Sequence, residues 1–258
     1  MTRVVCAVLL AALVGCGDDS GNGGNGDAGG SDSGGGSDAD VTGDGPPQQQ
    51  CGTLHAVIRD FKIDHPDFEI TPPNDVVIAG IVAPTITPGG KPKLATPPNA
   101  NDLIQDATTF SQWYTDVADV NQKFEQDFLL DETPPGSGTF VYDKPEYFPI
   151  DNEGFGNEGN AHNYHFTTEL HASFTYKGGE VFTFRGDDDV WVYVNGQLAI
   201  DIGGIHSANE RTIDFDAQAA ALGISVNNTY AIDFFQAERH VTGSSFKITT
   251  SIACFVIL

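Results

Sequence analysis

Three adjacent carboxylates form the part of this chain best suited to bind an ion. Asp187, Asp188 and Asp189 follow Arg185-Gly186 and precede an apolar, alternating stretch. Neighbouring carboxylates repel one another unless water screens them or a cation lies among them. Ca²⁺ accepts carboxylate and carbonyl oxygens in flexible geometry, so one interpretation of the triplet is a calcium site. The alternative is an exposed acidic turn whose carboxylates are solvated.

Alternating apolar and polar residues predict that this triplet joins two core strands as an acidic hairpin. From Tyr164 to Tyr176 the even positions are mostly apolar and the odd positions polar, which predicts a long strand with one buried face. Asn195-Gly196 is typical of a two-residue type I′ hairpin turn. The strands predicted in this way are Thr53–Phe61, Asp75–Val82, Tyr164–Tyr176, Glu180–Phe184 returning after the turn Lys177–Gly179, Val190–Val194, Gln197–Asp201, one through Ile213 and Phe215, Tyr230–Gln236 and Ser245–Ile252. Many strands between tight turns predict an all-β sandwich or barrel.

Two segments have helical spacing. Asp216–Leu222 is followed by Gly223, a typical helix stop. Phe110–Phe128 places several aromatic residues near one helical face, so we expect a second helix there. Between the N-terminal strands, Pro84–Pro98 is expected to form a Pro-rich excursion without regular structure.

The N-terminus has the features of a lipoprotein leader. Arg3 precedes an apolar run, Val4 to Val14, and Leu13-Val14-Gly15-Cys16 has the form of a lipobox. The run is too short to remain as a membrane-spanning helix. We therefore predict a signal peptide over residues 1–15, lipid on Cys16, and attachment to the cell envelope at the outer membrane or cell surface. An ordinary cleaved secretory signal is the alternative, and it leaves the compartment unchanged.

Residues 16–50 are expected to form a disordered Gly/Ser/Asp tether. This stretch has no aromatic residue and too few aliphatic ones to offset the entropy of ordering. Its root-mean-square reach is about 30 Å. The whole chain carries −24; without Arg3 and the seven Asp of the tether, residues 51–258 carry −18. Such a charge disfavours nucleic acid and anionic membrane surfaces, so membrane contact is expected only through the lipid.

Two cysteines remain in the folded part, Cys51 and Cys254, one at each end. Thiols at opposite ends of an exported domain usually pair, so we predict a disulfide that ties the termini together. Closing so long a loop stabilises the fold by roughly 4 kcal/mol in the chain-entropy view.

The segment around the acidic triplet resembles a known domain family. Phe184 to His206, which reads FRGDDDVWVYVNGQLAIDIGGIH, is similar to the fibro-slime domain, a relative of the protective-antigen-type lectin domains of flocculins and bacterial surface proteins. Arg59–Phe61 with His65–Glu69, His162–Glu169 and Ala237–His240 resemble other parts of that domain. The resemblance covers nearly all of Cys51 to Ile252. It implies one antiparallel β-sandwich domain over residues 51–258, with one or two short helices.

The resemblance also implies a binding site. In the lectin relatives a pair of Asp residues joined by a cis peptide binds calcium, and the calcium holds sugar hydroxyls; here the pair would be Asp187 and Asp188. Glu238 is the only acid in the facing loop and is our choice of further calcium ligand. The residues expected to contact the ligand are Asp189, His206 and Arg239. Two alternatives stay open: His206 hydrogen-bonds a tight turn, the interpretation we favour, and Arg239 pairs with an Asp of the hairpin and replaces the metal.

Other polar groups are weaker candidates for ion binding. The Gly- and oxygen-rich loop Asp151–Asn160 could hold a second cation, but it lacks EF-hand spacing and a surface loop is the favoured interpretation. His162, His165 and His171 do not form a zinc pattern.

The function expected is therefore a membrane-anchored surface lipoprotein that displays a calcium-dependent module binding an extracellular polysaccharide or other glycan. The first alternative is a structural matrix or protein-interaction module of the same fold without a sugar site. The second is a glycoside hydrolase, which is disfavoured because adjacent Asp residues on one turn are a poor acid–nucleophile pair. No nucleophile elbow, P-loop or zinc-protease motif occurs, so we expect no enzyme.

Overall fold

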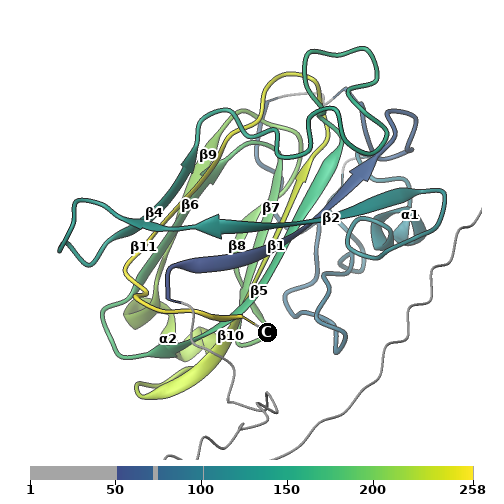
Figure 1. Ribbon diagram of the computed structural model, residues 1–258. Helices are drawn as coiled ribbons and strands as arrows, with labels where there is room; N and C mark the ends of the chain where they lie inside the picture. The colour runs from purple at the N-terminus through teal and green to yellow at the C-terminus, as the bar shows by residue number, and fades with distance from the viewer. Residues whose placement is uncertain (1–50, 72–74, 101, 258) are drawn as a thin grey trace, which may run out of the picture. The chain divides into compact units, whose positions relative to one another are not determined.

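Two antiparallel sheets face each other in the computed structural model, which describes residues 51–71, 75–100 and 102–257 (Figure 1). The larger sheet has the strand order β2-β1-β5-β10-β7-β8, with β12 also pairing with β5. The smaller sheet has the order β3-β4-β11-β6-β9. The predicted all-β sandwich is confirmed. The expected signal peptide, lipidated Cys16 and tether lie outside the described residues.

The chain passes several times between the two sheets and contains two short helices. The strands are β1 Thr53–Phe61, β2 Asn121–Leu129, β3 Asp131–Glu132, β4 Phe140–Lys144, β5 Phe166–Tyr176, β6 Val181–Gly186, β7 Asp189–Val194, β8 Gln197–Ile202, β9 Asn209–Asp214, β10 Asn228–Glu238, β11 Phe246–Thr250 and β12 Val256–Ile257. The helices are α1 Ala107–Ser111 and α2 Phe215–Leu222. Within the described part of the chain, no helix is long and apolar enough to cross a membrane.

Local sequence signals set several of these elements correctly. β1 has the predicted bounds. Asn195 and Gly196 both adopt positive φ, 50° and 73°, as a type I′ turn between β7 and β8 requires. α2 ends at Gly223, whose left-handed conformation (φ 65°) lets its N–H cap the helix at the Ala219 carbonyl.

The helix predicted over Phe110–Phe128 is wrong. Only α1 is helical there, and β2 pairs with β1 over nine residues, with Phe124 opposite Ile58. The cause is an ambiguity of spacing: Phe124 and Phe128 are four residues apart, which puts them on one face of a helix and equally on one face of a strand. The partner strand decides between the two.

The strand predicted over Asp75–Val82 is also absent; the described part of that segment makes one isolated bridge, from Val82 to Leu94.

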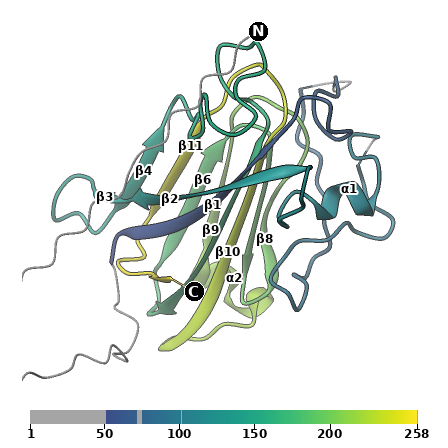
Figure 2. The same ribbon diagram turned by 45° about the vertical axis from the view of Figure 1, so that its right-hand side comes forward.

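A layer of loops covers the outer face of the large sheet. This covering layer comprises the described residues between β1 and β2 and carries α1 (Figure 2). One core lies between the two sheets, and a second lies between the large sheet and the covering layer, where Trp113 packs near Trp191 and Tyr193. Eight of the nine residues from Phe166 to Phe174 are therefore buried, so the single buried face predicted for this strand is wrong.

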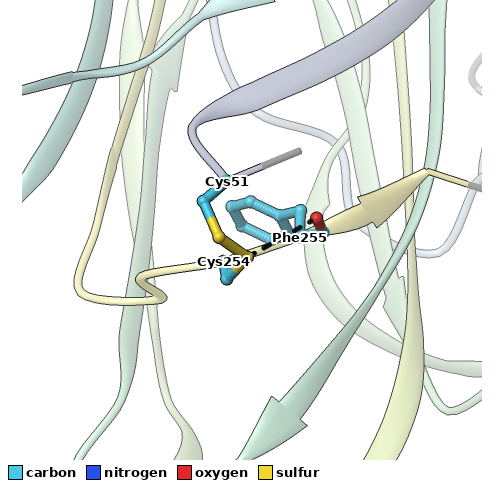
Figure 3. The surroundings of a disulfide bond; sticks show 3 residues. All are labelled: Cys51, Cys254 and Phe255. Carbon is cyan, nitrogen blue, oxygen red and sulfur yellow. Dashed lines mark hydrogen bonds between the residues drawn. A yellow bond between two sulfur atoms is a disulfide. The ribbon is translucent and has the colours of Figure 1, made fainter. Parts of the chain in front are cut away.

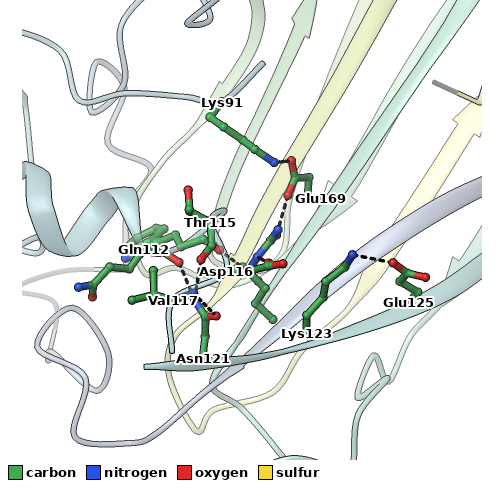
Figure 4. Close-up of polar contacts among 12 residues, drawn as sticks. Lys91, Gln112, Thr115, Asp116, Val117, Asn121, Lys123, Glu125 and Glu169 are labelled. Atoms are coloured by element: carbon green, nitrogen blue, oxygen red, sulfur yellow. Dashed lines mark hydrogen bonds and ion pairs between the residues drawn. The ribbon is translucent and has the colours of Figure 1, made fainter. Parts of the chain in front are cut away.

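Ion pairs fasten the covering layer to the sheet. Arg59 of β1 donates from Nε to Asp116 of the layer (2.8 Å) and from Nη1 to Glu169 of β5 (2.6 Å). Lys91, from the Pro-rich excursion, reaches the same Glu169 carboxylate (Figure 4). Although burial by itself would raise its pKa, hydrogen bonds and positive charge from His171, Lys91 and Arg59 lower the pKa of Glu169 to about 2.

His171 completes this cluster on the outer face of the sheet. Its ring lies 2.6 Å from Asp233 Oδ1 and 2.5 Å from Glu169 Oε1, measured from Nδ1 and Nε2. Burial alone would lower the pKa of His171, but the two carboxylates raise it to about 9. The protonated ring makes three cations against three carboxylates, so this cluster is charge-balanced at neutral pH.

The predicted disulfide between Cys51 and Cys254 is confirmed (Figure 3). Their Cα atoms are 4.3 Å apart although 203 residues separate them in sequence. The bond ties the residue two before β1 to the residue two before β12, and these strands both pair with β5. It therefore closes the domain at both ends of its chain.

Candidate functional site

The acidic triplet lies in a crossover between the sheets and is not a hairpin. β6 pairs with β11 and β9 of the small sheet, whereas β7 pairs with β10 and β8 of the large one. We call residues 186–189 the acidic crossover. Its first residue is Gly186. Only glycine fits here, because an added Cβ would lie 2.5 Å from the Ser245 carbonyl oxygen. The crossover thus approaches the segment before β11 more closely than any side chain would allow.

Asp188 is held in a left-handed conformation with its carboxylate turned inward. Its φ is 52°, a region that costs most residues about 1–2 kcal/mol and that Asp tolerates better than most. Its oxygens accept from the backbone N–H groups of His206 (3.1 Å) and Arg239 (2.9 Å). The Asp187–Asp188 peptide is trans, so the cis bond implied by the lectin relatives is absent; the cis bonds in the described residues precede Pro97 and Pro134.

Asp189 and Arg239 form an internal ion pair. Arg239 Nε donates to Asp189 Oδ2 (2.7 Å), and the other Asp189 oxygen accepts from the Gly204 N–H (2.6 Å). Both side chains are fully buried, and Arg239 also donates to the carbonyls of Asp67 and Leu103 in the covering layer (2.8 Å each). We expected both residues to contact the ligand, but neither side chain has an exposed atom with which to do so. Arg239 does pair with an Asp of the triplet, but this pairing leaves the other two carboxylates unneutralised.

Glu238 is the chemically unusual group of the site. It is fully buried at the end of β10, and neither of its carboxylate oxygens has a partner in good hydrogen-bond geometry, although the Ser244 hydroxyl and the Asp188 carboxyl lie beside it and affect its pKa. Burial, then the charge of Asp188 and further the charge of Asp187, raise the pKa of Glu238 well above its usual range. Burial likewise raises the pKa of Asp188 to about 7, although Arg239 opposes the shift. Two adjacent buried carboxyl groups hold a proton between them or bind a cation, because a bare pair is too unfavourable.

The donor set fits a hard cation. Carboxylates of Asp187, Asp188 and Glu238 and the buried hydroxyls of Ser244 and Ser245 supply only oxygen. Within the described residues no three His, Cys, Asp or Glu side chains converge into a complete metal cage. Calcium here would need oxygens beyond these side chains, from backbone, water or a bound ligand.

A cavity of about 240 Å³ lies beside the acidic crossover. His206 lines it, with Asp75, His240 and Thr242. His206 Nδ1 donates to the Ser207 carbonyl (2.9 Å), so its buried Nε2, which has no partner, is a free acceptor when the ring is neutral. The backbone N–H of His206 also donates to Asp188. His206 therefore hydrogen-bonds the turn, which is the interpretation we favoured from the sequence, and it also lines the cavity.

Some of these residues carried no signal in the sequence. Asp75 accepts from the Ser207 N–H and hydroxyl (2.7 Å each), which lowers its pKa, and 132 residues separate the two. Ser244 lies in the loop between β10 and β11 and differs in no local pattern from other loop residues; His240 belongs to the segment Ala237–His240 that resembles the fibro-slime domain, but it was not among the expected site residues. Only proximity in the fold identifies them.

The weaker candidates are occupied by protein partners. In the loop Asp151–Asn160, Asp151 accepts from the Asn163 N–H (2.8 Å) and contacts the His162 ring (2.6 Å). The buried Asp60 carboxylate clamps this loop by accepting from the Phe155 N–H (2.5 Å), and a Cβ on Gly154 would lie 2.1 Å from it.

His162, His165 and His171 each contact a carboxylate, and within the described residues they share no site.

Comparison with known proteins gives a consistent family. The sequence profile described as the PA14 domain matches residues 115–254. The chain is 39% identical to protein psiD of Dictyostelium discoideum over 212 residues, which cover 77% of this chain and 41% of psiD. It is 35% identical to protein psiC of the same organism over 214 residues, 78% of this chain and 41% of psiC. The chain thus spans less than half the length of these curated relatives.

Two solved structures of PA14 domains also align with part of this chain. A PA14 sugar-binding domain from an RTX adhesin aligns over 80% of this chain and 94% of that domain, at 10% identity and a TM-score of 0.34. The PA14 domain of the MpAFP antifreeze protein aligns over 49% of this chain and 74% of that domain, at 13% identity and a TM-score of 0.29. With the profile match and the extended identity to the psi proteins, the predicted relationship is confirmed: the chain belongs to the PA14 domain family.

Proposed function

We propose that this protein is a surface lipoprotein whose folded domain binds glycans through calcium at the acidic crossover. The observation that carries the proposal is Glu238, a fully buried carboxylate whose oxygens lack a partner in good hydrogen-bond geometry, beside a second buried carboxylate, Asp188. A divalent cation at this point would neutralise both. Asp187, which is half-buried, would contribute from the solvent side.

The incomplete set of protein ligands supports a calcium ion shared with a sugar. Calcium takes six to eight oxygens, and within the described residues no group of three or more His, Cys, Asp or Glu side chains is placed to hold a metal ion by itself. Vicinal hydroxyls of a saccharide would complete the coordination from the adjoining cavity. There, the exposed Asp75 carboxylate at the rim would accept a hydrogen bond from a sugar hydroxyl.

The membrane attachment and the spacing from the membrane are part of this proposal. Lipid on Cys16 would anchor the chain at the cell envelope, and residues 16–50 would hold the domain clear of the surface. Metabolic labelling with a fatty acid tests the anchor: the label should enter the native chain and be lost in Cys16→Ala. Labelling that survives this substitution would refute lipidation at Cys16.

Calcium binding is tested by thermal unfolding of the full, oxidised chain in calcium and in chelator. We expect calcium to raise the midpoint of the native protein and to lose this effect in Glu238→Gln, which keeps the side-chain shape and removes the charge. Asp143→Asn on β4, an exposed carboxylate of the small sheet, is the matched control and should respond as the native chain does. An unchanged native midpoint would refute the calcium site.

Binding to a glycan panel in the same two solutions tests the sugar. Calcium-dependent binding that Glu238→Gln abolishes is the expected result. A calcium-dependent midpoint without binding to any glycan would replace the proposal with the structural matrix or protein-interaction module. Release of reducing sugar from a bound glycan would instead indicate a hydrolase.

A further inference from the structure

A second, larger groove opens where β1 ends. Its volume is about 370 Å³, and it lies between the loop that follows β1 and the segment from α1 to β2. Pockets for small molecules typically measure roughly 300–1,000 Å³. This groove reaches that range, whereas the cavity beside the acidic crossover, at about 240 Å³, does not. The groove is lined by Lys62, Asp64, His65, Gln112 and Asp119.

The hydrogen bonds of His65 fix the direction of the Gln112 amide. The Asp67 N–H donates to His65 Nδ1 (3.3 Å), so this nitrogen is an acceptor and the ring proton lies on Nε2. His65 Nε2 therefore donates to Gln112 Oε1 (3.0 Å). Burial lowers the pKa of His65, which favours this neutral form. Because the Gln112 oxygen is engaged, its amide NH₂ is presented as a donor.

The groove has one wall held by packing and a rim with more negative than positive charge. The His65 ring packs edge-on against Phe61 and Phe68, with centroids 5.2 and 5.1 Å apart. Asp64 and Asp119 are exposed acceptors, while the Lys62 ammonium lies 4.9 Å from the centre of the Phe155 ring. A ligand that both donates and accepts hydrogen bonds can pair with these groups. A strongly anionic ligand would be repelled by the two carboxylates. Fixed polar groups also lower the entropy lost on binding.

We propose that this groove is a second saccharide subsite that takes a neutral, hydroxyl-bearing sugar without calcium. Gln112 donates to a sugar hydroxyl or ring oxygen, and Asp119 accepts from hydroxyls. The proposal extends the glycan-binding function argued above, but it uses different residues. Both subsites lie at one end of the large sheet, because Phe166 at the start of β5 pairs with Asp60 on one side and with Glu238 on the other.

The test is a titration of the ¹⁵N-labelled full chain with cellobiose, maltose and mannobiose, and with glucuronic acid as the anionic counterpart. In chelator, at least one neutral disaccharide should shift the side-chain amide of Gln112, and glucuronic acid should not. Gln112→Ala should weaken this binding at least tenfold. Gln126→Ala, an exposed glutamine on β2 outside the groove, should leave it unchanged.

Asp119→Asn is a second variant that should keep the fold. Asn tolerates the φ of 64° at this position, and the change removes only the carboxylate. It should weaken binding while the backbone spectrum is preserved. No shift of Gln112 with any neutral sugar, or a shift with the uronate alone, overturns the proposal. Calcium-dependent glycan binding without any response of Gln112 would leave the function at the acidic crossover standing and refute only this subsite.

Discussion

Replacing Arg239 with Met is expected to destabilise the domain by about 4 kcal/mol. The change keeps a long apolar stem but removes the charge that neutralises Asp189, and both side chains are fully buried. Leaving one partner of a buried pair uncompensated typically costs about 3–5 kcal/mol. The hydrogen bonds to the Asp67 and Leu103 carbonyls are also lost, at roughly 1 kcal/mol net each, while water entering the space offsets part of this.

Urea denaturation of the oxidised protein measures this free energy, with Lys247→Met as the matched control. Lys247 also pairs with an Asp at 2.7 Å, but the side chains of Lys247 and Asp143 are 38% and 45% exposed. Exposed pairs of this kind contribute about 0–1 kcal/mol, so the control should unfold close to the native midpoint. The two pairs have the same separation, so distance does not account for a difference between the variants; burial and the two carbonyl hydrogen bonds of Arg239 do.

A double-mutant cycle with Asp189→Asn tests the cause of the loss. If the uncompensated carboxylate dominates, the double variant should regain stability relative to the sum of the two single changes, with a coupling energy above about 1 kcal/mol. Equal losses in Arg239→Met and Lys247→Met, or strictly additive single changes, would refute the claim that this ion pair holds the crossover and the covering layer together.

Three further perturbations have defined outcomes. Replacing Cys51 and Cys254 with Ser should lower the free energy of unfolding by about 5 kcal/mol in the chain-entropy model, somewhat more than the roughly 4 kcal/mol expected from the sequence, because the bond joins residues 203 apart in sequence. Denaturant midpoints of the oxidised native chain and the variant measure this loss, and equal midpoints would contradict it. The raised pKa of His171 contributes stability that is fully present below pH 6.5 and is lost as the pH rises through about 9. The melting temperatures of the native chain and of His171→Gln should therefore converge above that pH. A gap between the two melting temperatures that stays constant with pH would exclude the linkage. In urea, Gly154→Ala should destabilise the domain by about 1–3 kcal/mol more than Gly156→Ala. Both glycines have positive φ, but only a Cβ at Gly154 would clash with the Asp60 carboxylate that hydrogen-bonds this loop. Similar losses in the two variants would show that the contact relaxes.

Much of the candidate site could be named from the sequence, but its working arrangement could not. The acidic triplet was identifiable from its composition, and Glu238 and Arg239 from the resemblance to the lectin domains. Which carboxylate pairs with Arg239 depended on the crossover between sheets, which turns Asp189 outward to the covering layer and Asp188 and Glu238 toward each other. Adjacent residues on a strand face opposite sides, so neighbours in the triplet have different environments.

The sequence alone determined the elements whose cause is local. Alternation placed most of the strands, Asn195-Gly196 set a hairpin through its tolerance of positive φ, and two terminal thiols determined the disulfide. Only the tertiary structure decided whether Phe124 and Phe128 form a helix or a strand, since a spacing of four satisfies both. It alone also decided that β5 is buried on both faces and that the Glu238 oxygens have no partner in good hydrogen-bond geometry. Those properties depend on which distant segments pack together, and no local pattern of residues records that.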